Sequence, residues 1–432
     1  MRQLLYCLFL VLTFPIAQLC YGQIPTDPYE EEDTLKIVRS HVPGSGFRLI
    51  NKPDGVLTFS AYASTRYLNQ TGLDDNYTDA FGRTKNIDKR NDLQFQKVML
   101  YFKGWLFDPK FRYLLYVWTS NTSQGQGAQV VLGGNFQYQF NKHLDVGVGI
   151  GGLPTNRSMY GQFPGWLRMD ARNMTEEFFR GSFTTGIWVQ GEIFKNMYYR
   201  TMLGNNLSQL GIDAGQLDGG FDTWSSGLWH TTNNYGRMGP YGDFERHNSL
   251  ATLLGASYSR SNETRQSQPD SEAPENSQIR LSDGTGLFAI NAFDTDASVL
   301  SAKYEMVNIT GGLKWKGFSF DADYFLRWVS KLETTGPIPV DQLFDHGLSL
   351  QGSSMLLDKT LQAYLTGAFI FGEYGDPTEF NLGLNWFPFK NKSFRVNAEY
   401  IRAYRSPVGY ASFPTQVGAN GNVFMINLEL FY

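Results

Sequence analysis

From Val56 to the C-terminus, the chain is a succession of about 16 stretches in which apolar and polar residues alternate. Strict alternation is the pattern of a β-strand with one apolar and one polar face. The connections between these stretches are alternately very short and long. The short ones are turns such as 107–110, 194–196 and 315–317, and the long ones are polar segments rich in Gly, Asn, Asp and Ser. This pattern favours a large antiparallel sheet, either closed into a barrel or packed as a sandwich.

The stretches predict one strand each, with lengths that suit tilted membrane strands. The eighth and ninth alternate least regularly, and the link between them, 231–245, is too long for a standard turn. The expected strands are 56–66, 91–106, 111–120, 128–140, 144–152, 184–194, 197–205, 221–230, 246–260, 302–315, 318–330, 347–357, 361–371, 379–387, 394–404 and 422–432.

The final stretch separates the two architectures. It places Phe424, Ile426, Leu428 and Leu430 on one face, and mostly polar residues on the other. At the edge of a soluble sheet, such a face needs charge, proline or a bulge to prevent aggregation, and this stretch has none of these on its apolar side. We therefore expect it to pair with the first strand and to close a barrel that faces lipid. The terminal aromatic, Tyr432, is typical of chains that the barrel-assembly machinery recognises.

The two ends of the predicted barrel differ in the way that outer-membrane barrels do. In outer-membrane barrels, the short turns are periplasmic and the long loops are extracellular. Aromatic residues gather beside the short turns, as in an interfacial belt; examples are Trp105, Phe140, Phe194, Trp315 and Trp386. The predicted fold class is thus an all-β transmembrane antiparallel β-barrel of about 16 strands, located in the outer membrane of a Gram-negative cell.

The N-terminal region is expected to lie outside the barrel. Residues 1–22 combine Arg2, a long apolar run and a small residue before the expected cleavage point, which is the pattern of a secretory signal peptide. Both cysteines, Cys7 and Cys20, fall within it, so the mature chain is expected to have no disulfide. Residues 23–55 begin with an acidic run and predict a polar periplasmic leader, followed by the barrel, 56–432.

Four hairpin regions, 100–118, 186–206, 313–328 and 384–401, carry a family resemblance. With them, the chain resembles the porin superfamily of sixteen-stranded outer-membrane barrels. Within that superfamily it is similar to the phosphate-selective porin O and P family, in the form found in Bacteroidetes. The resemblance implies a homotrimer, a loop folded into the pore and the uptake of anions or phosphate.

The third long loop, 153–183, is the segment expected to fold into the barrel. It carries a mixed set of charges able to set the size and the charge of a constriction. Asn173, with Glu176 three residues later, predicts a capping box that opens a short helix. An ordinary surface loop with solvated charges is the alternative. The predicted constriction residues are Arg157, Arg168, Asp170, Arg172, Glu176, Glu177 and Arg180.

The parity of the strands also predicts which charges face the lumen. The basic candidates are Lys97, Lys103, Arg112, Arg200, Lys314, Arg327 and Arg395, and the acidic ones are Asp145, Glu192, Asp321, Asp323, Glu399 and Glu429. Because the two signs nearly balance, we expect a general porin for small hydrophilic solutes or ions. A phosphate- or anion-selective channel and a structural barrel without an open pore are the alternatives. The other interpretation is that each of these charges forms a salt bridge that stiffens the wall.

Nothing in the sequence points to catalysis. Neighbouring residues on a strand point to opposite faces, so His247, Asn248 and Ser249 cannot act together as a triad. The chain has neither the His spacing of a zinc enzyme nor a glycine-rich phosphate loop. We therefore expect no enzyme activity, no metal and no cofactor. A net charge of -4 argues against a nucleic-acid partner.

Overall fold

The structure is a computed structural model that describes residues 42–120, 129–159, 166–208, 220–237, 240–264, 279–289, 292–293, 295–409 and 413–432. The predicted signal peptide, 1–22, and most of the predicted leader lie outside the described residues. Among the residues that are described, no helix has the length and hydropathy needed to cross a membrane.

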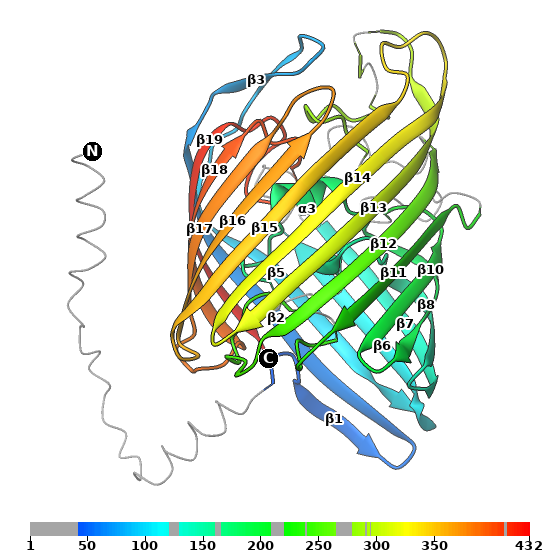
Figure 1. Ribbon diagram of the computed structural model, residues 1–432, viewed down its shortest axis with the longest axis vertical. Coiled ribbons are helices and arrows are strands. Elements are labelled where there is room, and N and C mark those ends of the chain that lie inside the picture. The colour runs from blue at the N-terminus through cyan, green and yellow to red at the C-terminus, as the bar shows by residue number, and fades with distance from the viewer. Residues whose placement is uncertain are drawn as a thin grey trace, which may run out of the picture. The chain divides into compact units, whose positions relative to one another are not determined.

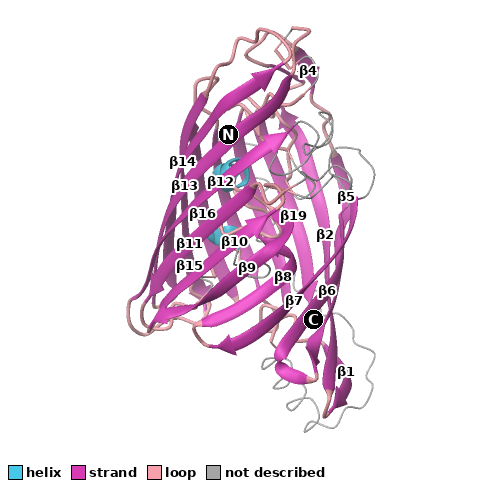
Figure 2. Ribbon diagram, turned by 90° about the vertical axis from the view of Figure 1, so that its right-hand side faces the viewer, coloured by secondary structure: helices cyan, strands magenta, loops and turns pink. Residues whose placement is uncertain are grey.

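The strands of the described chain form a closed antiparallel barrel of 16 strands (Figures 1 and 2). Each barrel strand pairs with the next one in sequence, and the last pairs with the first. The predicted fold class is therefore confirmed. The barrel strands are β2 (Gly55–Leu73), β5 (Asn91–Leu106), β6 (Asp108–Ser120), β7 (Gln129–Asn141), β8 (Leu144–Gly152), β9 (Phe183–Phe194), β10 (Met197–Gly204), β11 (Thr223–Thr231), β12 (Ala251–Thr264), β13 (Val299–Trp315), β14 (Phe318–Thr334), β15 (Leu343–Leu357), β16 (Leu361–Phe371), β17 (Thr378–Trp386), β18 (Phe394–Tyr404) and β19 (Gly421–Phe431).

The seam between β2 and β19 closes the ring. Backbone pairing runs from Phe431 opposite Tyr62 to Gly421 opposite Leu73. Inside the barrel, the Tyr62 hydroxyl donates to Glu429 at 3.0 Å, which adds a side-chain hydrogen bond across the seam. The expected pairing of the first and last strands is confirmed. The first strand is longer than predicted, because its pairing with β19 continues past residue 66.

The two faces of the wall are opposite in character. The interior-facing polar residues of β17, such as Asn381 and Asn385, are buried. The outward Leu382 is 59% exposed, and its neighbours Phe380 and Leu384 are similarly exposed. Exposed apolar side chains over a polar interior are the arrangement that a lipid bilayer requires, since the backbone of a closed barrel is fully hydrogen-bonded.

The two ends of the barrel differ in the length of their connections. The turn end carries the short turns, such as 195–196 and 316–317, and the loop end carries the long connections. At the loop end, two short strands, β3 (Asn76–Thr78) and β4 (Thr84–Asn86), form a separate hairpin.

The sequence analysis missed a strand next to the barrel. β1 (Phe47–Lys52) pairs with the start of β2, with Phe47 opposite Phe59 and Lys52 opposite Gly55. It continues the line of β19, because the rings of Phe47 and Tyr432 are 4.4 Å apart. All six β1 residues are exposed, and they do not alternate cleanly between apolar and polar, so the strand depends on its partner rather than on its own pattern.

Candidate functional site

The connection between β8 and β9, residues 153–182, folds into the barrel and is called the inner loop below; its residues 160–165 are not described. It contains a 3₁₀ turn, η1 (Arg157–Met159), and a helix, α3 (Met174–Phe179), which lies inside the ring of strands (Figures 1 and 2). The predicted capping box is confirmed, because the Asn173 side chain accepts a hydrogen bond from the Glu176 amide at 2.9 Å and Glu176 reaches back to the Asn173 amide. Local capping therefore starts the helix.

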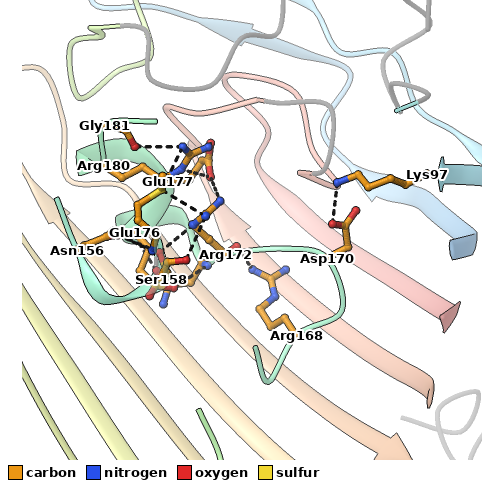
Figure 3. A network of polar contacts seen from close by, with 12 residues as sticks. Lys97, Asn156, Ser158, Arg168, Asp170, Arg172, Glu176, Glu177, Arg180 and Gly181 are labelled. Carbon is orange, nitrogen blue, oxygen red and sulfur yellow. Dashed lines mark hydrogen bonds and ion pairs between the residues drawn. The ribbon is translucent and has the colours of Figure 1, made fainter. Parts of the chain in front are cut away.

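Ion pairs fasten the inner loop to the wall on two sides, and Figure 3 shows the one between Lys97 and Asp170. The Arg168 guanidinium lies 2.8 Å from Glu379 on β17 and 2.6 Å from Glu399 on β18. Asp170 pairs with Lys97 on β5 at 2.7 Å. All five side chains are almost completely buried. Charges buried in this way must be paired, so these contacts fix where the loop crosses the lumen.

A third attachment lies on β14. Arg157 pairs with Asp321 at 2.5 Å, and the Tyr235 hydroxyl donates to the same carboxylate at 2.6 Å. Arg157 also contacts the Tyr235 hydroxyl directly, and its guanidinium stacks over the ring of Tyr241 at 4.3 Å. Arg157 is therefore held from both the wall and the link between β11 and β12.

The remaining charges of the inner loop bond mainly within the loop (Figure 3). Arg180 pairs with Glu177 at 2.6 Å, and Arg172 lies 3.8 Å from the same Glu177 carboxylate. Arg172 also donates to the Ser158 hydroxyl at 2.8 Å, which ties α3 to η1. The structure thus brings all seven predicted loop residues together inside the barrel, and none is more than 9% exposed.

Glu176 is the one acidic side chain of this cluster held by neutral donors. Tyr241 donates to one of its oxygens at 2.6 Å and Gln351 of β15 to the other at 3.2 Å. Burial raises the pKa of the Glu176 carboxyl, and the hydrogen bond from Tyr241 opposes this change only in part. The carboxyl therefore keeps its proton to a higher pH than an exposed glutamate does.

Seven of the thirteen predicted lumen residues lie on the inside of the β13–β19 wall and are buried: Lys314, Asp321, Asp323, Arg327, Arg395, Glu399 and Glu429. Ion pairs connect adjacent strands here, with Arg327 2.6 Å from Asp345 and Arg395 2.6 Å from Glu429. Lys97 lies buried on β5 across the loop. On this part of the wall, most of the predicted charges form bonds between strands or to the inner loop, and Lys314 donates to the Tyr235 carbonyl in the link between β11 and β12 at 3.4 Å.

Three of the other five predicted residues lie on the β5–β10 wall, where Arg112 is exposed and Lys103 and Arg200 are partly buried. The Lys103 amine donates to the Gly44 carbonyl. Arg112 donates to Gln139 at 2.6 Å and Arg200 to Gln190 at 3.2 Å. Two further charges considered in the sequence analysis, Asp145 and Glu192, lie on the same wall and are also partly exposed.

Glycines shape this wall. A Cβ atom on Gly147 of β8 would lie 2.2 Å from the ring of Trp188 on β9, so the indole covers the glycine. The Arg200 guanidinium lies over the same ring, 4.9 Å from its centre. Toward the loop end, the interior-facing Asn135 and Met202 are buried. The accessible part of the interior is therefore the turn-end half of this wall.

Sequence reasoning missed several residues of the site. Asp345 and Glu379 follow the interior parity of β15 and β17, so alternation could have found them. Tyr235 and Tyr241 lie in the link that was too long for a standard turn, and this length was the available signal. Among the described residues, no group of three His, Cys, Asp or Glu side chains is arranged to hold a metal.

Comparison with known proteins places the fold. No family model matches the sequence, and no curated protein matches it. An anion-selective porin from Comamonas acidovorans is similar in structure, with a TM-score of 0.55 and 10% identity, over 88% of this chain and 100% of that one. The trimer form of OmpT, an outer membrane protein of Vibrio cholerae, gives a TM-score of 0.53 and 13% identity over 88% and 100%.

The outer membrane channel DcaP of Acinetobacter baumannii gives a TM-score of 0.51 and 10% identity, over 90% of this chain and 100% of that one. Two of these three similar structures are described as outer-membrane proteins, and two as a channel or a porin. Together with the outward apolar face, the closed barrel places this chain in the outer membrane. The chain has the fold of the outer-membrane porins.

Proposed function

We propose that the chain is a general porin, which lets small hydrophilic solutes and ions diffuse passively across the outer membrane. The observation that carries the proposal is the inner loop, which lies inside a barrel with a polar interior and is fastened to the wall by Arg157, Arg168 and Asp170. In this proposal the inner loop narrows the lumen, and its seven charged residues hold it in place.

The accessible charges support weak ion preference. Lys103, Arg112 and Arg200 face the interior with Asp145 and Glu192, so the two signs nearly cancel on the β5–β10 wall. Charged rings of one sign are needed for strong selectivity. An anion- or phosphate-selective channel is the finer alternative; one similar structure is described as an anion-selective porin. In this chain the arginines of the inner loop are paired with carboxylates or bonded within the loop, which favours the general porin.

A structural barrel without an open pore is the second candidate. The observation in its favour is burial, because interior side chains along β14–β19 and toward the loop end of β9 and β10 have almost no exposure. A conductance measurement distinguishes the structural barrel from the porin, because only the porin gives current steps.

The proposal includes a homotrimer, since one similar structure is described as a trimer form. It also includes removal of residues 1–22 on export, a periplasmic position for the chain before the barrel, insertion by the barrel-assembly machinery and direct contact with outer-membrane lipid. It assigns no catalytic activity, cofactor or nucleic-acid partner. Chemical cross-linking of the protein in native outer membranes tests the trimer, and a monomer band alone would contradict it.

The decisive experiment reconstitutes the purified protein into a planar bilayer and measures single-channel current and reversal potential across a KCl gradient, before and after phosphate is added. Stepwise conductance with a small reversal potential and no phosphate block is expected. The double variant Arg112→Gln, Arg200→Gln should shift the reversal potential toward cation preference. Lys195→Gln, at an exposed turn, is the matched control and should leave it unchanged.

Strong anion selectivity with block by phosphate would replace the general porin with the selective one. If no current steps appear with correctly folded protein, the structural barrel becomes the better account.

A further inference from the structure

The link between β11 and β12, residues 232–250, is the one connection at the turn end that folds deep into the barrel among the residues that the structure describes. It is called the inner link below; residues 238–239 are not described. Its Tyr235, Tyr241 and Phe244 are each 5% exposed or less. Aromatic side chains on an ordinary turn would lie at the membrane interface, so their burial shows that this connection enters the lumen.

The inner link is anchored at the turn end before it enters. The Asp243 carboxylate, which is fully buried, accepts a hydrogen bond from the Gly317 amide in the neighbouring β13–β14 turn at 2.7 Å. The same carboxylate lies 2.5 Å from the His247 ring within the link. Phe244 packs against Met355 and Phe387, at the turn-end sides of β15 and β17. The link is therefore a built element with fixed contacts.

Its tip meets the inner loop, which comes from the opposite end of the barrel. The Tyr241 hydroxyl donates to Glu176 of α3 at 2.6 Å. Tyr235 and Arg157 share the Asp321 carboxylate. A Cβ atom on Gly242 would lie 3.0 Å from the Leu167 side chain, so the backbone of the link touches the loop. These three contacts join the two segments.

We propose that the inner link is a second constriction segment and that Tyr235 and Tyr241 set the aperture by holding Arg157 and Glu176 of the inner loop. This proposal deepens the proposed function and rests on it for its effect on conduction. The wall beneath the link, β14–β16, is thereby filled, and solutes are confined to the β5–β10 side, where Arg112 and Arg200 are accessible.

The first test removes only the two hydroxyl groups, in the double variant Tyr235→Phe, Tyr241→Phe. Each hydroxyl bonds to a carboxylate, so its loss should raise the fraction of loosened loop by about tenfold or more. Limited trypsin digestion in detergent reads this out, because Arg157, Arg168, Arg172 and Arg180 are buried when the loop is held. Cleavage after these arginines, identified by mass spectrometry, should accelerate by the same factor.

Tyr258→Phe is the matched control. The Tyr258 hydroxyl also donates to a carboxylate, that of Glu305 at 2.8 Å, but on the outward side of β12. Its removal should leave cleavage of the inner loop unchanged. If the double variant is cleaved no faster than this control, the proposal that Tyr235 and Tyr241 hold the inner loop is overturned.

The second test replaces residues 232–252 with a two-residue Asn-Gly turn, because Thr231 and Leu253 are directly paired on the two antiparallel strands. Single-channel conductance should rise above that of the full chain, since the link no longer lies in the lumen. Equal conductance in a folded variant overturns the aperture role. If the shortened chain does not fold, the double phenylalanine variant decides the question, with increased open-channel noise and faster cleavage as the expected result.

The two proposals fail in different ways. Absence of current in the full chain removes the porin function, while the digestion experiment still measures whether the tyrosines hold the inner loop. Normal current with unchanged cleavage and conductance in the variants removes only the second constriction segment.

Discussion

The Nε atom of Arg168 on the inner loop lies 2.6 Å from the carboxylate of Glu399 on β18, and both side chains are excluded from solvent. The same guanidinium pairs with Glu379. One cation therefore neutralises two carboxylates at the place where the loop meets the wall. This contact makes the loop sensitive to single substitutions, because a buried charge that loses its partner has no water to replace it.

Replacing Arg168 with methionine should destabilise the barrel by about 3–5 kcal/mol, since Glu379 and Glu399 would then be buried without a cation. Urea titration in detergent, followed by the shift of the folded band on electrophoresis, measures the change. Lys359→Met is the control; Lys359 pairs with Glu245 on the surface, and its loss should cost about 0–1 kcal/mol. Adding Glu379→Gln and Glu399→Gln to Arg168→Met should restore part of the stability. No restoration would mean that packing, not charge, explains the loss.

Stability should depend on pH through Glu176. Burial raises the pKa of its carboxyl, so the folded protein binds a proton that the unfolded chain releases above the ordinary glutamate pKa of about 4.3. From that value up to the raised one, the free energy of unfolding should fall as pH rises. Glu176→Gln should flatten this part of the profile of unfolding temperature against pH. Glu373→Gln, at an exposed carboxylate, should retain the wild-type slope; identical slopes in both variants would contradict the assignment.

Gly147→Ala should destabilise the β8–β9 wall by about 1–3 kcal/mol, because the added methyl group overpacks the contact with Trp188. Thermal unfolding, together with a change in tryptophan emission, tests this. Gly352→Ala is the control, since the nearest heavy atom to its added Cβ is 3.9 Å away. A loss of stability of equal size in both variants would indicate a general effect of removing glycine from a strand.

The outward face should tolerate charge only near its ends. Leu382 lies in the middle of β17 and is 59% exposed, so Leu382→Arg should destabilise the protein in lipid bilayers by about 2–4 kcal/mol. Phe389→Arg, at the turn that follows β17, should cost about 0–1 kcal/mol. Refolding equilibria in phospholipid vesicles give both values. Equal costs at the two positions would mean that the bilayer centre is not at Leu382.

Alternation predicted the strands because their period of two reflects a single physical division between lipid and interior. β5, β8, β16 and β18 begin and end where expected, and the apolar face predicted for the final strand, from Phe424 to Leu430, is exposed. β1 could not be found in this way, since its six residues have no buried face. Its strand conformation comes from pairing with β2, and a pattern within six residues carries no information about a pairing partner elsewhere in the chain.

The site was predicted as a list of residues, but not as a set of pairs. Parity correctly placed Asp321 and Glu399 on the interior face, yet it carries no information on which side chain lies across the barrel. Arg168 and Glu399 are 231 residues apart, and their contact depends on the path of the inner loop. For the same reason, the sequence could not separate the accessible Arg112 from the buried Arg327.

The seam between β2 and β19 also determines at what stage of synthesis the barrel can close. The hydrogen bond from Tyr62 to Glu429 spans 367 residues, so almost the entire polypeptide must be synthesised and exported before the ring can close. Until then, the edge of β2 that pairs with β19 is unpaired. A fragment that lacks β19 is therefore an open sheet whose edge strands, β2 and β18, each have one unpaired side.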